Sequence, residues 1–170
     1  MPLLKHGRPV ADVWIAVADA TAPPAGDHLL LTADQLADYG AVPVEARPDA
    51  RWGVTWPNDR PVSDLAPHLD RLSLVCLSFP TFKDGRAYSQ ARQLREHYGF
   101  SGEIRATGQV LRDQFAFMVR AGFDALLVAR DADADAFDRE VASIPVVYQP
   151  GADNRMTAFR ARVGGAGVAS

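Results

Sequence analysis

The sequence predicts a single α/β domain built on a mostly parallel β-sheet, which is either open or curled like part of a barrel. Strand-like and helix-like segments alternate at about 20–25 residues per unit, which is typical of right-handed βαβ crossovers. A continuous apolar run, Leu72–Phe79, has the composition of a strand that is buried on both faces. At 170 residues, the chain suits one hydrophobic core and is shorter than the roughly 250 residues of a closed eight-unit barrel.

The first half of the chain is predicted to form short strands that are separated by turns. We expect strands over residues 12–17, 28–31 and 52–56. Thr32 and Gln35 have the spacing of a capping box, which predicts a helix that ends near Gly40. Ser63 is a candidate N-cap for a short helix over residues 63–68.

The second half alternates strands and helices more regularly. After Leu72–Phe79 we expect a helix over 86–98 with Gly99 as its C-cap, a strand over 103–107, a helix over 109–121 that ends at Gly122, and a strand over 125–129. A last helix is expected over 135–142 and a last strand over 146–148. The domain is assigned to residues 1–162, and the Gly- and Ala-rich tail 163–170 is expected to be disordered.

The composition argues against several classes of function. The formal net charge of −3 and the absence of a basic tract argue against nucleic acid as a partner. No apolar run reaches the roughly 20 residues of a membrane span, and the first residues do not resemble a signal peptide, so we expect a cytoplasmic protein without a membrane partner. The four scattered histidines lack metal-ligand spacing, so no metal is expected, and no glycine-rich fingerprint indicates a cofactor.

The single cysteine and several aromatic residues are expected in the core. Cys76 lies in the middle of the apolar run, where a small buried hydrophobic residue is favoured over a nucleophile. Phe79 and Phe82 flank a proline, and they either pin a loop to the core, which is favoured, or present an apolar contact surface.

Basic residues concentrate within residues 79–122, which hold seven Lys and Arg residues against four Asp and Glu residues. They surround two predicted strand-to-helix junctions. The N–H groups at the start of a helix favour anions, and ligands of parallel sheets bind outside the carboxyl ends of the strands. We therefore expect a ligand near these junctions.

At the first junction, Asp84, Gly85 and Arg86 precede a predicted helix. One interpretation is local: Asp84 caps the helix, and Arg86 is solvated. The other is functional: Arg86, with Ser89 one turn later and Arg92 in the same basic stretch, binds an anion or a partner. Asp84 is then a candidate acid–base residue.

At the second junction, Glu103 and Arg105 project from the same face of one strand because they are two residues apart. They form either a structural salt bridge or a site in which Glu103 holds Arg105 as a substrate ligand and is itself a catalytic candidate. Arg112, Asp113 and Gln114 follow in the first turns of the next predicted helix and complete the candidate binding residues, although dipole complementarity alone is sufficient to explain Asp113.

These segments also carry a family resemblance. The matching residues include Phe79, Phe82, Asp84-Gly85-Arg86, Gly102-Glu103-Ile104-Arg105, Arg112-Asp113-Gln114 and Gly122-Phe123-Asp124. Over residues 53–128 the chain resembles a bacterial family of unknown function whose members are commonly labelled oxidoreductases of sulfite reduction. It departs from the usual pattern at Ile104, Gln109 and Ala121, where Leu, Asp and Cys are common. Ala121 argues against an essential redox cysteine at that position.

The resemblance implies a place in assimilatory sulfate reduction, because genes of this family tend to lie beside those of sulfite reductase. One hypothesis is an accessory protein that binds sulfite reductase or a small anion such as sulfite through its arginine-rich face, or that helps to deliver siroheme or electrons. The alternative is an oxidoreductase or other enzyme that holds a small sulfur oxyanion between Arg86 and Arg105. The accessory role is favoured because the sequence contains no redox motif. The sequence gives no signal for an oligomeric state.

Overall fold

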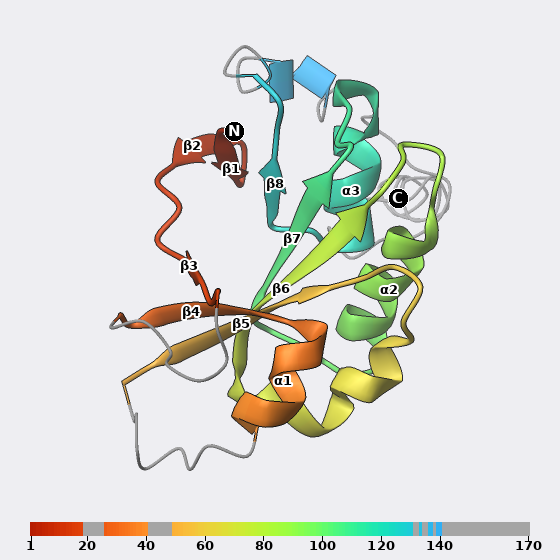
Figure 1. Cartoon of the computed structure of the whole chain (residues 1–170). Helices are drawn as coiled ribbons and strands as arrows, with labels where there is room; N and C mark the ends of the chain where they lie inside the picture. The colour runs from red at the N-terminus through yellow and green to blue at the C-terminus, as the bar shows by residue number, and fades with distance from the viewer. Residues whose placement is uncertain (19–25, 41–48, 131–132, 134–135, 138, 141–170) are drawn as a thin grey trace, which may run out of the picture.

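The computed structural model of the chain describes residues 1–18, 26–40, 49–130, 133, 136, 137, 139 and 140, and it confirms the predicted fold class. One sheet has the strand order β2-β1-β8-β7-β6-β5-β4-β3. The strands are β1 (Leu3–Lys5), β2 (Arg8–Val10), β3 (Ile15–Ala16), β4 (His28–Thr32), β5 (Arg51–Trp56), β6 (Leu72–Phe79), β7 (Glu103–Gly108) and β8 (Ala125–Leu127). Strands β3 to β8 are parallel and in sequence order, and β1 pairs antiparallel with β2 and β8. The sheet curls into an open half-barrel (Figure 1).

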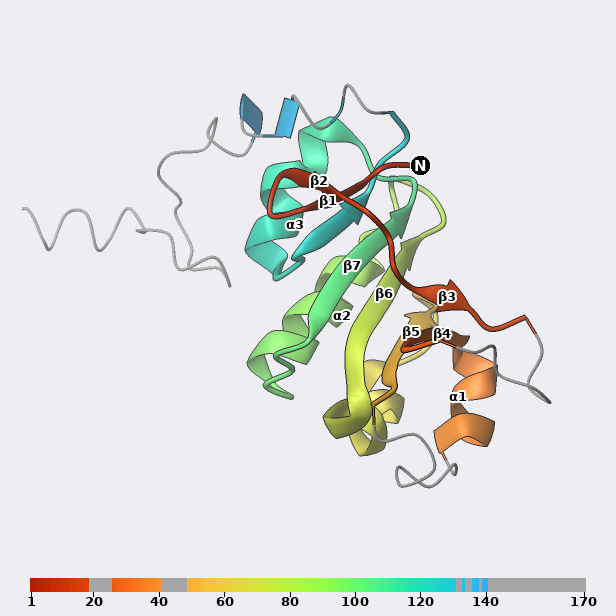
Figure 2. The same cartoon turned by 90° about the vertical axis from the view of Figure 1, so that its left-hand side faces the viewer.

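The helices lie on one face of this sheet, as expected when parallel strands follow one another by right-handed crossovers (Figure 2). They are α1 (Ala33–Gly40), η2 (Val62–Arg71), α2 (Arg86–Glu96), η3 (Arg112–Gln114) and α3 (Phe115–Ala121), where η denotes a 3₁₀ helix. The N-terminal chain passes across the opposite, concave face between β2 and β3 (Figure 2). Among the described residues, the two faces of the sheet therefore have different coverings, helices on the convex side and an extended segment on the concave side.

The main hydrophobic core lies between the sheet and the helices. Along β6 and β7, alternate residues such as Val75, Leu77 and Ile104 are fully buried in this core. The residues between them, including Cys76 and Arg105, point to the concave face, where they are also buried and lie opposite one another across the β6–β7 pair. A charged residue is thus buried on the face of the sheet opposite the helices that the structure describes.

Several local predictions are confirmed. Thr32 and Gln35 form a reciprocal capping box, in which the Thr32 N–H donates to Gln35 Oε1 at 2.9 Å and the Gln35 N–H donates to Thr32 Oγ1 at 3.3 Å. Strand β6 has the predicted bounds Leu72–Phe79. Helix α3 ends at Gly122, whose φ of +103° is the left-handed conformation that suits glycine at this position.

The N-terminal region differs from the prediction. The β1–β2 hairpin is absent from the expected elements because its strands have only three residues each and turn at His6 and Gly7, both with positive φ. The strand expected over 12–17 is reduced to β3, because Asp12 and Trp14 turn onto the concave face instead of pairing with a neighbouring strand. The hairpin supplies the antiparallel end of the sheet.

Three expected helices also need correction. The helix expected over 109–121 begins with the 3₁₀ helix η3, because Gly108 has a φ of +88° and Leu111 is extended. Ser63 is not an N-cap, since η2 begins after Pro61 and extends to Arg71. Helix α2 ends at Glu96, with His97 as its C-cap, and the predicted cap Gly99 instead takes a positive φ two residues later. The helix over 135–142 in large part, the strand over 146–148 and the tail 163–170 lie outside the described residues.

Candidate functional site

A cavity of about 550 Å³ opens on the concave face at the amino ends of the parallel strands. Its lining comes from the first residues of four strands, His28, Arg51, Leu72 and Glu103, together with Arg105 and the N-terminal chain. The sequence predicts a ligand at the opposite, carboxyl ends of the strands. The second predicted junction, Glu103 with Arg105, therefore belongs to a different edge of the sheet from Asp84, Arg86 and the residues around Gln114.

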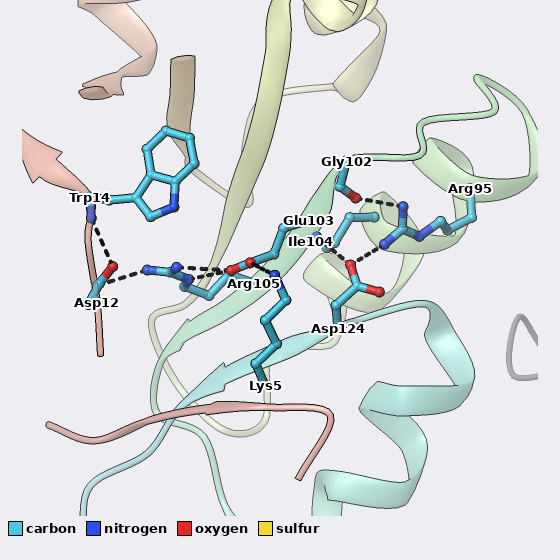
Figure 3. Close-up of polar contacts among 9 residues, drawn as sticks. All are labelled: Lys5, Asp12, Trp14, Arg95, Gly102, Glu103, Ile104, Arg105 and Asp124. Atoms are coloured by element: carbon cyan, nitrogen blue, oxygen red, sulfur yellow. Dashed lines mark hydrogen bonds and ion pairs between the residues drawn. The ribbon is translucent and has the colours of Figure 1, made fainter. Parts of the chain in front are cut away.

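Arg105 is the centre of an ion network in this cavity (Figure 3). Its Nε donates to Glu103 Oε1 at 3.0 Å, its Nη2 lies 2.9 Å from the same oxygen, and its Nη1 donates to Asp12 Oδ2 at 2.9 Å. Lys5 Nζ contacts the other oxygen of Glu103 at 2.7 Å. The side chain of Arg105 is only 4% exposed and that of Glu103 11%, whereas that of Asp12 is 41% exposed. Glu103 and Arg105 therefore form the predicted salt bridge, and the pair also lines a cavity.

Cys76 lies beside Arg105 on the concave face and is buried, as predicted. Burial raises the pKa of this thiol to about 12, although the neighbouring Arg105 charge acts in the opposite direction. At neutral pH the side chain is a protonated thiol. This state is unreactive as a nucleophile, which fits a core residue.

The raised pKa of Cys76 predicts an alkaline loss of stability. The unfolded thiol ionises near its ordinary pKa of 9, whereas the folded thiol stays protonated up to about 12. The raised pKa of Cys76 therefore stabilises the folded state fully below pH 9, and this stabilisation is lost as the pH rises from 9 towards 12. Between pH 9.5 and 10.5, we expect the free energy of unfolding of the wild type to fall by about 1 kcal/mol more than that of Cys76→Ala. Urea titrations at both pH values measure this difference, and parallel pH profiles for the two proteins would contradict it.

At the first predicted junction, Asp84 and Arg86 form an ion pair with each other. The Asp84 carboxylate receives Arg86 Nε at 2.9 Å, Arg86 Nη2 at 2.6 Å and the Arg86 backbone N–H at 3.2 Å. The bonds from Arg86 hold the pKa of Asp84 well below its usual range, and the same pairing raises the pKa of Arg86. Asp84 is one residue before the N-cap Gly85, and at neutral pH it is an ionised carboxylate that can accept a proton but has none to donate.

The residues of η3 bind neighbouring loops at the carboxyl end of the sheet. Arg112 Nε forms a short ion pair with the buried carboxylate of Asp133. Burial acts to raise the pKa of Asp133, but the bonds from Arg112 and Arg130 outweigh this effect and lower the pKa. Gln114 Nε2 donates to the Phe82 carbonyl oxygen at 2.9 Å. These contacts attach the 3₁₀ helix to the chain on both sides of it.

A second hollow, a groove of about 430 Å³, lies on the outer face between α2 and α3. Its lining residues, which we call the docking face, are Tyr88, Arg92, Asp113, Gln114, Phe117, Arg120 and Ala121. Phe117 is 54% exposed, and Arg92 is likewise exposed, with its carboxylate partner Glu96 as far as 3.9 Å away. Ser89 lies beside this groove and lines a smaller one of about 330 Å³ with Arg92, at the exposed surface of α2. The structure thus gathers Arg92, Asp113 and Gln114 on one surface, with Arg86 and Arg105 elsewhere.

Sequence reasoning missed several residues of these sites, among them Phe117 and Asp12. Phe117 lies in the helix predicted over 109–121 but outside its apolar face, which includes Phe115 and Met118, and a large aromatic outside such a face is the signal that could have found it. Asp12 is 93 residues away from Arg105 in the chain, and no local pattern connects the two. Phe79 is fully buried as predicted, whereas Phe82 is 45% exposed, with Lys83 Nζ 5.6 Å from the centre of its ring.

Arg95 forms a second ion network, which lies towards the helical side (Figure 3). Its Nη1 donates to the carbonyl oxygens of Phe100 at 2.5 Å and Gly102 at 2.8 Å, and its Nε donates to that of Gly122 at 3.1 Å. Nη2 forms a short ion pair with Asp124, whose carboxylate also receives the Ile104 N–H at 2.8 Å. Arg95 thus joins the ends of α2 and α3 to the start of β7, which is a structural role.

Among the residues that the structure describes, no group of three or more His, Cys, Asp or Glu side chains is arranged to hold a metal ion. In the same part of the chain, no helix has the length and apolar character needed to span a lipid bilayer.

The fold and these sites define a half-barrel α/β protein with a charged concave cavity and an arginine-bearing helical face. Its sequence matches the profile of a known family over residues 53–159, from the second half of β5 to beyond β8. The chain belongs to DUF934, a family of bacterial proteins of unknown function. No curated protein matches it. The predicted resemblance to a bacterial family of unknown function is therefore confirmed. The N-terminal residues that cover the concave face precede the matched region.

Proposed function

We propose that this protein is a cytoplasmic accessory protein of assimilatory sulfite reduction, and that it binds sulfite reductase through the docking face. The observation that carries this proposal is that exposed Phe117 and exposed Arg92 line the same groove between α2 and α3. Aromatic and arginine side chains are enriched at the energetic centres of protein interfaces. The pathway comes from the family resemblance in residues 53–128.

The charge of the docking face indicates what kind of segment it would bind. Helix α2 carries Arg86, Arg92 and Arg95 against the single acidic residue Glu96. Arg95 and Arg86 are held by Asp124 and Asp84, so Arg92 is the arginine of α2 with the loosest carboxylate contact. A partner segment with an apolar side chain for Phe117 and a carboxylate for Arg92 would fit this surface.

The proposal is tested with purified sulfite reductase from the same bacterium. We expect it to bind the wild-type protein in a titration at moderate salt, and the double variant Phe117→Ser with Arg92→Glu to bind about 30-fold more weakly or worse. The matched control, Val13→Ser with Arg8→Glu, alters an exposed aliphatic and an exposed arginine on the N-terminal segment and should bind like the wild type. Equal affinities for the two double variants would exclude the docking face.

A second candidate function is an enzyme that acts on a small sulfur oxyanion. The observation that favours it is the cavity in which the Glu103 carboxylate lies against buried Arg105. In this reading Arg105 holds the anion and Glu103 is the acid–base residue. Sulfite and sulfate should then raise the melting temperature of the protein at millimolar concentrations. An unchanged melting temperature far above that range would exclude this activity.

A further inference from the structure

We propose that the concave cavity is a binding site for a small oxyanion, and that the Asp12 carboxylate occupies the place of this ligand in the structure described above. This inference concerns Arg105 and the N-terminal chain. It deepens the second candidate function, since it identifies Asp12 as the group that the anion would replace at Arg105, and it is independent of the docking face, so either can fail without the other. The shared chemistry of the ligand is a compact anionic group with at least two oxygen atoms, as found in carboxylates and in sulfur oxyanions.

The first argument is the asymmetry of burial around Arg105. Its guanidinium group is 4% exposed and is fixed on one side by Glu103, which Lys5 also contacts at 2.7 Å. The Asp12 side chain on the other side is 41% exposed. An exposed carboxylate can return to water at little cost, whereas a buried guanidinium group cannot leave its site. Of these ions, Asp12 is therefore the one that another anion can replace.

The second argument is the segment that carries Asp12. Residues 11–14, which we call the strap, connect β2 to β3 without forming a strand, and residues 11–13 are all exposed. Its contacts with the sheet include the Asp12–Arg105 ion pair and the Trp14 ring, which covers Gly53 so closely that a Cβ there would lie 2.9 Å from the indole. Only Trp14 of the strap is half-buried, so local opening of residues 11–13 costs little free energy.

The third argument is the charge of the cavity. Its lining includes three basic side chains, Lys5, Arg51 and Arg105, and one carboxylate, Glu103. When Asp12 leaves, the lining therefore has an excess of positive charge that an anion would neutralise. The volume of about 550 Å³ is within the range of small-molecule sites. Ser73 and Ser101 add hydroxyl groups to the same lining.

The test removes Asp12 and measures anion binding. Acetate and sulfite are titrated by calorimetry at constant ionic strength, with chloride as the balancing anion, against the wild type and Asp12→Ala. We expect at least one of the two anions to bind Asp12→Ala ten-fold or more tightly than the wild type. Whether acetate or sulfite gains more identifies which source of oxyanion the site prefers. Equal affinities in the two proteins for both anions, or no binding to either, would overturn the proposal.

Two controls make this result specific. Asp34→Ala removes another exposed carboxylate, which pairs with Arg60 on the helical side, and should leave anion affinity unchanged. Asp12→Ala with Arg105→Met should abolish the gain, and retained binding would contradict the role of Arg105. Hydrogen exchange of a peptide that covers residues 8–17 gives a readout that needs no second variant. Exchange in the wild type should accelerate when the bound anion displaces the strap, and an unchanged rate at saturation would contradict displacement.

Discussion

Arg95→Met is expected to lower the free energy of unfolding by about 3 kcal/mol, because one half-buried side chain serves four acceptors. The substitution leaves the carbonyl oxygens of Phe100, Gly102 and Gly122 without these donors and deprives the Asp124 carboxylate of its cation. The Arg95 side chain is 17% exposed, so water replaces these bonds only in part. Urea denaturation followed by circular dichroism measures the change.

The matched control for Arg95 lies one helical turn earlier. Arg92 is on the same helix, but its side chain is 59% exposed and its ion pair with Glu96 spans 3.9 Å. We expect Arg92→Met to change the free energy of unfolding by less than about 0.5 kcal/mol. Similar losses of stability for the two variants would show that the Arg95 network does not hold the ends of α2 and α3 as described.

Gly108→Ala is expected to destabilise the protein by more than about 3 kcal/mol, since strain and a backbone clash add to one another. Gly108 has a φ of +88°, and a Cβ at this position would lie 2.4 Å from the carbonyl oxygen of Phe79. That oxygen also accepts the Gln109 N–H at 2.9 Å, so it cannot move away without breaking the contact between β6 and the loop after β7. Thermal unfolding should show a lower melting temperature.

Gly85→Ala is the corresponding control at the other strand-to-helix junction. Gly85 has a φ of −81°, and the nearest atom to an added Cβ is a ring carbon of Tyr88 at 3.9 Å. Alanine is accommodated there without strain, and its weaker preference for the N-cap opposes its lower unfolded-state entropy, so we expect a change of less than about 1 kcal/mol. Equal melting temperatures for Gly108→Ala and Gly85→Ala would contradict the close contact between Gly108 and the carbonyl oxygen of Phe79.

The parts of the fold that follow from local physics could be predicted from the sequence. The capping box of Thr32 and Gln35 and the apolar strand Leu72–Phe79 each depend on a few adjacent residues, and both match the structure. The β1–β2 hairpin could not be predicted, since strands of three residues gain their stability from pairing with β8, more than 100 residues later in the chain. Residues 109–111 were misassigned as helical for a similar reason, because Gly108 turns the chain to meet β6.

The candidate sites likewise combine features that follow from local sequence with features that depend on distant parts of the chain. The period of two residues in a strand is enough to place Glu103 and Arg105 on one face, and the structure pairs them. The strand period cannot show that Asp12 completes the network, because that contact depends on the path of the N-terminal chain over the concave face. The arginines were predicted to form one face, but Arg86, Arg105 and Arg112 each bind a carboxylate in a different part of the fold. Arg92 remains exposed beside Phe117.

The most direct test of the proposed function is the affinity of this protein for purified sulfite reductase, measured by calorimetry at a series of salt concentrations. The docking face predicts saturable binding that weakens as salt rises, because Arg92 contributes a charge to the contact, and that is lost with Phe117→Ser and Arg92→Glu. The account is contradicted if sulfite reductase gives no binding signal at low or moderate salt, or if the double variant binds as tightly as the wild type.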